Sequence, residues 1–163
     1  MEAIVRPDGL LMLRGGVFRA ALGARGVLAF KQEGDKATPA GVLPLRRVLY
    51  RADRVRPPPC AVALEPIGQA DGWCDDPAHR DYNRMVRLPH DGSCEALWRD
   101  DAVYDVIGVL GWNDQPVIRG RGSAIFLHVA RPDYAPTDGC IALALADLRQ
   151  VLAAGLTSIN VLA

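Results

Sequence analysis

The sequence has no charge imbalance and no long apolar run. Lysine plus arginine total 19 and aspartate plus glutamate total 19, so the formal net charge is zero at neutral pH. This balance gives no electrostatic preference for nucleic acid or for an anionic membrane. No stretch approaches the roughly 18 to 20 uninterrupted apolar residues that a membrane span needs. We therefore expect no nucleic-acid partner and no membrane span.

The N-terminal segment lacks the zones of a secretory signal peptide. Charged residues interrupt its apolar positions throughout, at Arg6, Asp8, Arg14, Arg19 and Arg25. A signal peptide instead has a basic start, a continuous apolar centre and a small-residue cleavage site. The pattern is compatible with cytoplasmic residence, with a leader removed from this sequence, or with export by another route.

Cysteine is scarce: the 163 residues include only four, which are Cys60, Cys74, Cys94 and Cys140. Four are too few for a disulfide-built scaffold, and no pair has the CxxC spacing of a zinc or redox site. Each cysteine must therefore be judged separately. The length is that of about one domain, and we treat residues 1–163 as a single unit.

Short apolar runs between glycine and proline turns dominate the chain. Pro7-Asp8-Gly9 and Gly15-Gly16 predict a meander of strands near the N-terminus. Only Leu145 to Ala154 has clear helical periodicity, and Gly155 follows where a helix terminator belongs. Pro57 to Glu95 has few periodic apolar positions and predicts an ordered insertion or long loop. The predicted fold class is mainly β with minor α, a β-sandwich or barrel-like domain.

His128 and Cys140 are the candidates for a catalytic pair. The apolar run from Ser123 ends at His128, and a Thr-Asp-Gly turn delivers Cys140 at the head of the next apolar segment. If these two segments are neighbouring strands, their ends would place the His128 imidazole beside the Cys140 thiol. A free thiol is mostly protonated at neutral pH, so it needs a nearby base to become a nucleophile. We interpret Cys140 as the nucleophile and His128 as its base.

Gly139 immediately precedes this cysteine, and we expect its backbone to shape the space around the sulfur. Glycine adopts backbone angles closed to other residues and leaves the approach to the sulfur open. Main-chain N–H groups around Gly139 and Cys140 would then face the oxygen that becomes negative during attack on a carbonyl. One such donor contributes roughly 3 to 4 kcal/mol in other enzymes.

Ordinary structural interpretations stand beside this one. A lone cysteine is often a small buried apolar residue, and a histidine closing a strand is often merely hydrogen-bonded. His79 and His90 lie in turn-rich loops, and we interpret Cys60 and Cys94 as structural.

Two further patterns carry little weight. Cys74, Asp75, Asp76 and His79 contain metal-ligand atoms, yet their spacing matches no established metal motif. Gly120-Arg-Gly-Ser123 is glycine-rich but lacks the P-loop pattern, so it predicts a turn.

The His128 to Cys140 block resembles the signature of the YkuD-type L,D-transpeptidase catalytic domain, in which a histidine precedes a [Ser/Thr]-His-Gly-Cys element. Three further segments are similar to family motifs in the expected order, and together the matches span about Lys31 to Leu148: Gly34 to Gly41, Trp73 to Pro77 with Tyr82 to Arg84, and Gly122 to His128. The resemblance points to a divergent short single-domain member.

The resemblance implies an acyl-enzyme on Cys140, general base and acid chemistry by His128, and an oxyanion hole that includes Gly139. It implies peptidoglycan stem peptides as substrates, 3-3 or 1-3 crosslinks as products, and location in the periplasm or cell envelope. No metal or other cofactor is implied, carbapenems are expected to acylate the cysteine, and we expect a monomer.

Two departures from the family pattern affect the site. Asp138 stands where the family has histidine before the glycine, and Ala142 replaces the usual arginine or asparagine. These changes and a short loop between His128 and Cys140 favour the 1-3 branch, with 3-3 crosslinking still open. Arg84 is the preferred partner of a substrate carboxylate, because guanidinium matches that anion bidentately. The other expected substrate-binding residues are Tyr82, Asn83, Tyr104, Asn113, Tyr134 and Asp138.

Two rival functions remain from the sequence. One is a cysteine carboxypeptidase or amidase that uses the same pair but transfers the acyl group only to water. The other is a wall-binding module that has lost catalysis, which the substitutions at Asp138 and Ala142 suggest.

Overall fold

Alternating burial along short segments gives the main sheet a covered and an exposed face. In β1 (Glu2–Arg6), Ala3 and Val5 are fully buried while the residues on either side are exposed, as expected for a strand with one covered face. The structure is a computed structural model that describes residues 1–163. It is mainly β with one short helix, which confirms the predicted fold class.

The other elements are β2 (Leu10–Leu13), β3 (Gly16–Ala21), β4 (Val27–Leu28), β5 (Thr38–Pro39), β6 (Gly41–Tyr50), β7 (Ala63–Pro66), β8 (Asp71–Cys74), β9 (Met85–Arg87), β10 (Cys94–Ala96), β11 (Val106–Leu110), β12 (Phe126–Val129), β13 (Ile141–Leu143), α1 (Leu145–Ala153) and β14 (Ser158–Val161).

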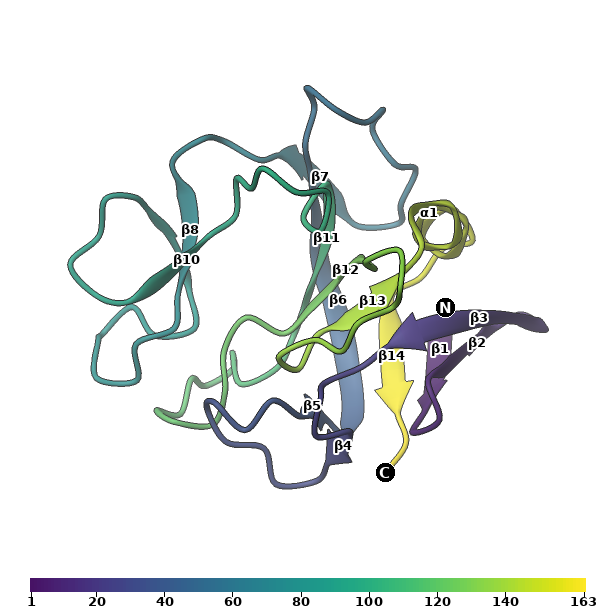
Figure 1. Ribbon diagram of the computed structural model, residues 1–163, viewed down its shortest axis with the longest axis horizontal. Coiled ribbons are helices and arrows are strands. Elements are labelled where there is room, and N and C mark those ends of the chain that lie inside the picture. The colour runs from purple at the N-terminus through teal and green to yellow at the C-terminus, as the bar shows by residue number, and fades with distance from the viewer.

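The main sheet contains nine strands in the order β11-β12-β13-β3-β2-β1-β14-β6-β7. β1, β2 and β3 pair antiparallel in succession, which confirms the predicted meander. β14 pairs parallel with β1 and antiparallel with β6, so the two ends of the chain meet inside the sheet. A further pairing of β11 with β6 closes the sheet into a barrel-like ring, and β7 adds to β6 outside it (Figure 1).

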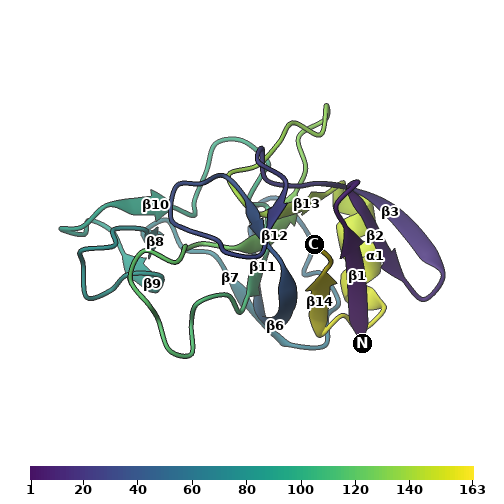
Figure 2. The ribbon, with the colours of Figure 1, turned by 90° about the horizontal axis from the view of Figure 1, so that it is seen from below.

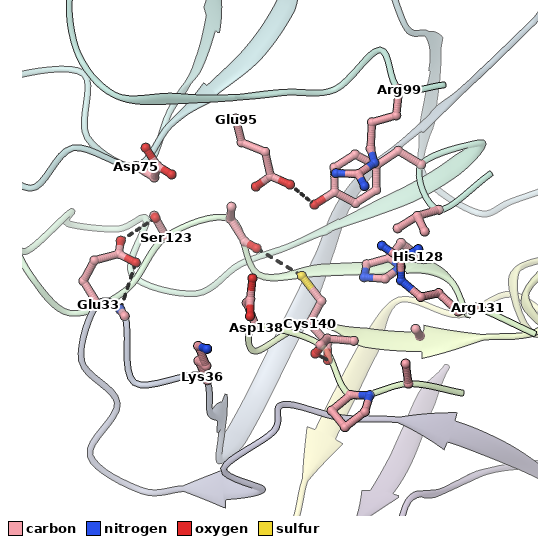
Figure 3. Close-up of a pocket in the computed structure, with 18 of the residues that line it drawn as sticks. Glu33, Lys36, Asp75, Glu95, Arg99, Ser123, His128, Arg131, Asp138 and Cys140 are labelled. Carbon is pink, nitrogen blue, oxygen red and sulfur yellow. Dashed lines mark hydrogen bonds between the residues drawn. The ribbon is translucent and has the colours of Figure 1, made fainter. Parts of the chain in front are cut away.

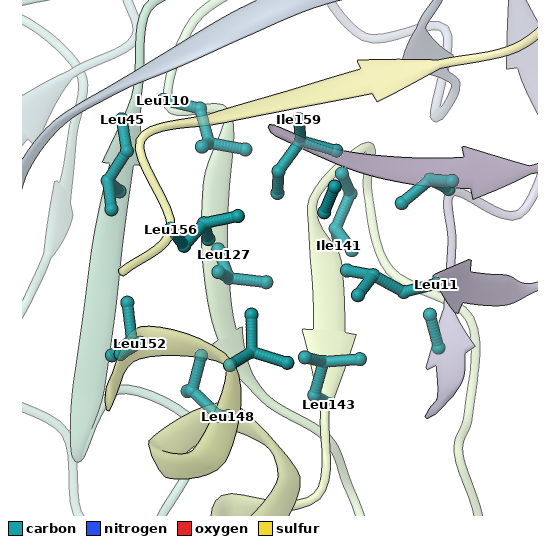
Figure 4. Close-up of a cluster of buried hydrophobic side chains, with 14 of the residues drawn as sticks. Leu11, Leu45, Leu110, Leu127, Ile141, Leu143, Leu148, Leu152, Leu156 and Ile159 are labelled. Atoms are coloured by element: carbon teal, nitrogen blue, oxygen red, sulfur yellow. The ribbon is translucent and has the colours of Figure 1, made fainter. Parts of the chain in front are cut away.

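The interior of this ring is filled by aliphatic side chains. Leu127 and Ile141 point into it from β12 and β13, and Leu11 and Ile159 reach it from the opposite strands (Figure 4). Leu148, Val151 and Leu152 of α1 are fully buried against the same cluster. The predicted helix is therefore confirmed, and Gly155 follows it with a positive φ of 95°. α1 has nine residues, and no helix of the structure is long and apolar enough to cross a membrane.

The segment predicted as an insertion or long loop has its own regular structure. It contains β7, and with β10 it forms a three-stranded antiparallel sheet in the order β10-β8-β9. This small sheet lies at one end of the molecule, far from β1 to β3 at the other end (Figures 1 and 2). Trp73 of β8 packs edge-on against Phe126 of β12, with 5.1 Å between ring centroids. The small sheet is thereby held against the barrel beside β12.

Truncation of the helix face should destabilise the barrel. We expect Leu148→Ala to lower the free energy of unfolding by about 2 to 5 kcal/mol, because the side chain is fully buried and leaves a cavity. Gln150→Ala, an exposed position on the same helix, should change it by less than about 0.5 kcal/mol. Urea denaturation followed by circular dichroism measures both, and equal effects would contradict this packing.

Candidate active site

The parallel pairing of β12 and β13 brings the predicted nucleophile and base onto one face. Leu127 lies opposite Ile141 in this pairing and both point into the barrel core. Because side chains alternate along a strand, His128 and Cys140 both point to the other, outer face. His128 lies opposite Ala142, two residues beyond Cys140, so imidazole and thiol are diagonal neighbours across two adjacent strands.

Both side chains line one cavity of about 620 Å³. The outer face of β12 forms its floor, the small sheet contributes one wall through Glu95, and the loop before Cys140 contributes another through Asp138 (Figure 3). His128 is 7% exposed and Cys140 is 8% exposed, so bulk water has little access to either. The predicted nucleophile and base therefore line the same cavity while both remain largely buried.

The Cys140 thiol is neutral in the resting site. It donates a hydrogen bond to the Ala124 carbonyl oxygen at 3.2 Å, and the Phe126 N–H donates to Sγ at 3.4 Å. Burial, together with the negative charge of Glu95, raises the pKa of this thiol to about 12. The thiol donates to Ala124 rather than to His128, so attack requires Sγ to turn away from that carbonyl.

His128 is held as a neutral imidazole with a defined tautomer. Its Nδ1 lies 3.0 Å from the Val129 carbonyl oxygen, which only accepts, so Nδ1 carries the proton and Nε2 has the free lone pair. Burial lowers the pKa of His128 to about 4. Tyr104 packs edge-to-face against the imidazole with 5.4 Å between centroids and fixes its plane. At neutral pH the ring is thus uncharged, with Nε2 unprotonated.

Gly139 occupies a position that no other residue fits. Its φ is 135°, and a Cβ added there would lie 2.7 Å from the Ala37 carbonyl oxygen. Its N–H already donates to Thr137 Oγ1 at 3.1 Å, and Thr137 Oγ1 donates to the Cys140 carbonyl oxygen at 2.7 Å. The Cys140 N–H, in contrast, has no acceptor within the chain. The Cys140 N–H is therefore an unengaged main-chain donor beside the sulfur.

Asn83 holds Ala124 in place, and the Ala124 carbonyl oxygen accepts the hydrogen bond from the Cys140 thiol. It is buried, and its Oδ1 accepts hydrogen bonds from Trp73 Nε1 at 2.9 Å and from the Ala124 N–H at 3.1 Å. Its amide nitrogen donates to the Trp112 and Asn113 carbonyl oxygens. Ala124 has a positive φ of 54°, a conformation unfavourable for alanine that these contacts hold in place. Asn83 therefore acts on the site through Ala124 and does not line the cavity.

The other predicted substrate-binding residues divide into two groups. Tyr104 and Asp138 line the cavity. Tyr82 is buried beside it, where its hydroxyl donates to Glu33 and accepts from the Gly122 N–H. Arg84 is exposed and Asn113 holds the loop at Ile118 and Gly122, and neither lines the cavity.

Tyr134 also lies outside the cavity, under the Arg19 guanidinium at 4.1 Å. Of the predicted substrate-binding residues, the fold brings only Tyr104 and Asp138 to the cavity that contains Cys140.

Several charged residues line the cavity that the sequence pattern did not indicate. Glu95 accepts a hydrogen bond from the Tyr104 hydroxyl, and burial raises the pKa of its carboxyl group. Arg99 pairs with Asp101 at 2.7 Å, and Arg131 lies 3.7 Å from the same carboxylate. The remaining charged residues of the lining are Glu33, Lys36 and Asp75. No local motif marks these residues, although Arg131 lies in the loop between His128 and Cys140.

The family model of the L,D-transpeptidase catalytic domain, YkuD, matches residues 4–157. The match covers nearly the whole chain, and the protein belongs to this family. No curated protein matches the chain.

One similar solved structure is the helical cell shape determining protein Pgp2 from Campylobacter jejuni. It is 15% identical, the TM-score is 0.41, and the alignment covers 98% of this chain and 46% of that chain. This chain therefore spans less than half the length of that protein.

The buried imidazole should make the fold sensitive to acid. The folded pKa of His128, about 4, lies below the ordinary 6.5, so protonation favours the unfolded state. The contribution of the neutral imidazole to the free energy of unfolding is complete above pH 6.5. It is lost as the pH falls toward 4, which lowers that free energy by about 3 kcal/mol. Urea denaturation between pH 7 and 4 should show a smaller loss for His128→Gln than for the unchanged protein. Parallel curves for the two would contradict the burial of a neutral imidazole.

Alanine at position 139 should be tolerated poorly. We expect Gly139→Ala to lower the free energy of unfolding by about 1 to 3 kcal/mol through backbone strain, with a further loss from the contact with Ala37. Gly26→Ala is the matched control, since Gly26 has a φ of 74° but open space around its Cβ position. Thermal and urea unfolding should show that Gly139→Ala is clearly less stable than Gly26→Ala. The reverse order of stability would contradict the close approach of Gly139 to Ala37.

Proposed function

We propose that the protein is a peptidoglycan L,D-transpeptidase that crosslinks stem peptides through an acyl-enzyme on Cys140. The observation that carries the proposal is the pair of His128 and Cys140, on one face of two adjacent strands in one cavity. Membership of the YkuD family supports the same reaction class. The substrate lies in the cell envelope, and we propose that the protein acts there.

The first half-reaction transfers an acyl group to sulfur. Sγ turns from the Ala124 carbonyl, its proton passes to Nε2 of His128, and the sulfur attacks a carbonyl carbon of the donor stem. A C–S bond forms and the peptide C–N bond breaks. His128 returns the proton to the leaving amine, which is D-alanine if the bond after diaminopimelate is cut.

The second half-reaction releases the thioester. The amine of a second stem attacks the acyl carbon, His128 accepts its proton, and the proton returns to sulfur as the new amide forms. Through both halves, the Cys140 N–H would donate to the oxygen that becomes negative, since it has no other acceptor. Water in place of the amine gives the carboxypeptidase reaction.

The charged lining of the cavity fits stem peptides, which carry both carboxylates and amines. We propose Arg131 as the carboxylate partner in place of Arg84, because Arg131 lines the cavity and Arg84 does not. Asp138 and Glu33 on the opposite side are suited to a substrate ammonium group. Arg99 is held against Asp101 and contributes positive potential with less freedom to move.

Incubation with defined muropeptides tests the proposal. We expect the unchanged protein to give crosslinked dimers by mass spectrometry, and fragmentation to identify a 1-3 or a 3-3 bond. Cys140→Ala should give no dimers, and His128→Ala should lower the rate by at least about 10² to 10⁴ because proton transfer is lost. Cys60→Ser, which alters a cysteine outside the cavity, should keep the activity of the unchanged protein.

The remaining outcomes separate the rival functions. Trimmed monomers without dimers would refute transpeptidation and favour the hydrolytic enzyme. Absence of any product, together with no acylation of Cys140 by a carbapenem, would favour a wall-binding module. A His128→Ala variant with most of its activity intact would refute the assigned base.

A further inference from the structure

Two cysteines outside the catalytic pair face each other across the small sheet. Cys74 ends β8 and Cys94 begins β10, and the antiparallel register places them directly opposite. The Asp75 N–H donates to the Ser93 carbonyl oxygen, and the Leu97 N–H donates to the Asp71 carbonyl oxygen. These bonds show which opposed residues of β8 and β10 are hydrogen-bonded pairs and which are not. The cysteines therefore occupy a non-hydrogen-bonded pair, where Cα atoms are only about 4.5 Å apart.

A histidine completes this group. Nδ1 of His90 lies 3.3 Å from Sγ of Cys94, and the ligand atoms of Cys74, His90 and Cys94 all lie within 4.8 Å of one another. A tetrahedral zinc ion with ordinary Zn–S and Zn–N distances separates sulfur from nitrogen by about 3.6 Å. The spacing thus requires only small side-chain movements to hold one ion.

The other side of the imidazole is held as in protein metal sites. The Gly92 N–H donates to Nδ1 of His90 at 3.0 Å, so this nitrogen presents a lone pair and Nε2 carries the proton. Nε2 in turn lies 2.9 Å from the Asp81 carboxylate. A carboxylate behind a histidine fixes the ring and strengthens it as a ligand. A metal at Nδ1 would replace the contacts of this nitrogen with the Gly92 N–H and with Sγ of Cys94.

We propose that Cys74, Cys94 and His90 bind a thiophilic divalent cation, with Zn²⁺ as the fitting ion. Two thiolates and one imidazole are the donor set that zinc prefers, and water would fill the fourth tetrahedral position. On binding, each thiol loses its proton to solvent and the ion gains two S–Zn bonds. The ion would join β8, β10 and the loop that carries His90, in the wall that supplies Glu95 to the cavity. This proposal is independent of the peptidoglycan reaction.

Cobalt substitution provides a test that does not depend on activity. The full chain is reduced, desalted without oxygen and titrated with Co²⁺. We expect saturation at one equivalent, with thiolate-to-cobalt charge transfer in the near ultraviolet and the intense visible bands of tetrahedral Co²⁺. One equivalent of Zn²⁺ should remove both signals. The titration is repeated in Cys140→Ala, so that binding by the catalytic cysteine is recognised.

Single substitutions assign the ligands. Cys94→Ser should abolish the charge-transfer band of one thiolate and the tetrahedral spectrum, and Asp81→Asn should weaken binding about 10- to 100-fold. Cys60→Ser should bind as the unchanged protein does. Circular dichroism confirms that each variant is folded.

Three results would overturn the proposal. One is a reduced, folded protein that gives no tetrahedral spectrum. Another is a spectrum that disappears in Cys140→Ala, which would place the ion at the catalytic pair. The third is a spectrum that persists in Cys94→Ser. Apart from these three results of the titration, the proposal also fails if the freshly purified protein has no zinc and no free thiol at Cys74 and Cys94. The pair then forms a disulfide, which its spacing also permits.

Discussion

The parallel pairing of β12 with β13 is the constraint on which the site depends. One register, Leu127 opposite Ile141, sends two leucine-sized side chains into the core and turns His128 and Cys140 outward. A slip by one residue would exchange the two faces, burying imidazole and thiol among aliphatic groups. The strong preference of the core for apolar side chains therefore fixes the geometry of the proposed catalytic pair. Stability and chemistry are coupled through the same few residues.

Burial gives this pair its resting state. Desolvation raises the pKa of Cys140 and lowers that of His128, so both groups stay neutral at pH 7. Separated charges would be costly on two groups that are so nearly buried. A reaction on this pair would therefore move the proton as the carbonyl is attacked, with the substrate present. The positive φ of Ala124 and its support by Asn83 belong to the same arrangement, because they hold the thiol's resting partner.

Much of the fold follows from local sequence. Period-two burial, the turn at Pro7-Asp8-Gly9 and the terminator Gly155 are local signals, and the meander and helix follow from them. Closure of the ring by β6 and β11 joins segments more than 50 residues apart, and no local signal records it. The site divides in the same way. A proposed nucleophile and base can be read from one short block, whereas Glu95 and Arg99 reach the cavity only through the tertiary fold.

The depth of Cys140 has a consequence for the lifetime of the protein in oxidising surroundings. Peroxides and small disulfides react with thiolates far faster than with thiols. A cysteine residue that is 8% exposed, with a thiol pKa raised to about 12, presents them with little of the reactive form. If Cys140 is the nucleophile as proposed, burial would protect it from chance oxidation until a ligand fills the cavity. Chemical selectivity and durability then come from the same small solvent exposure.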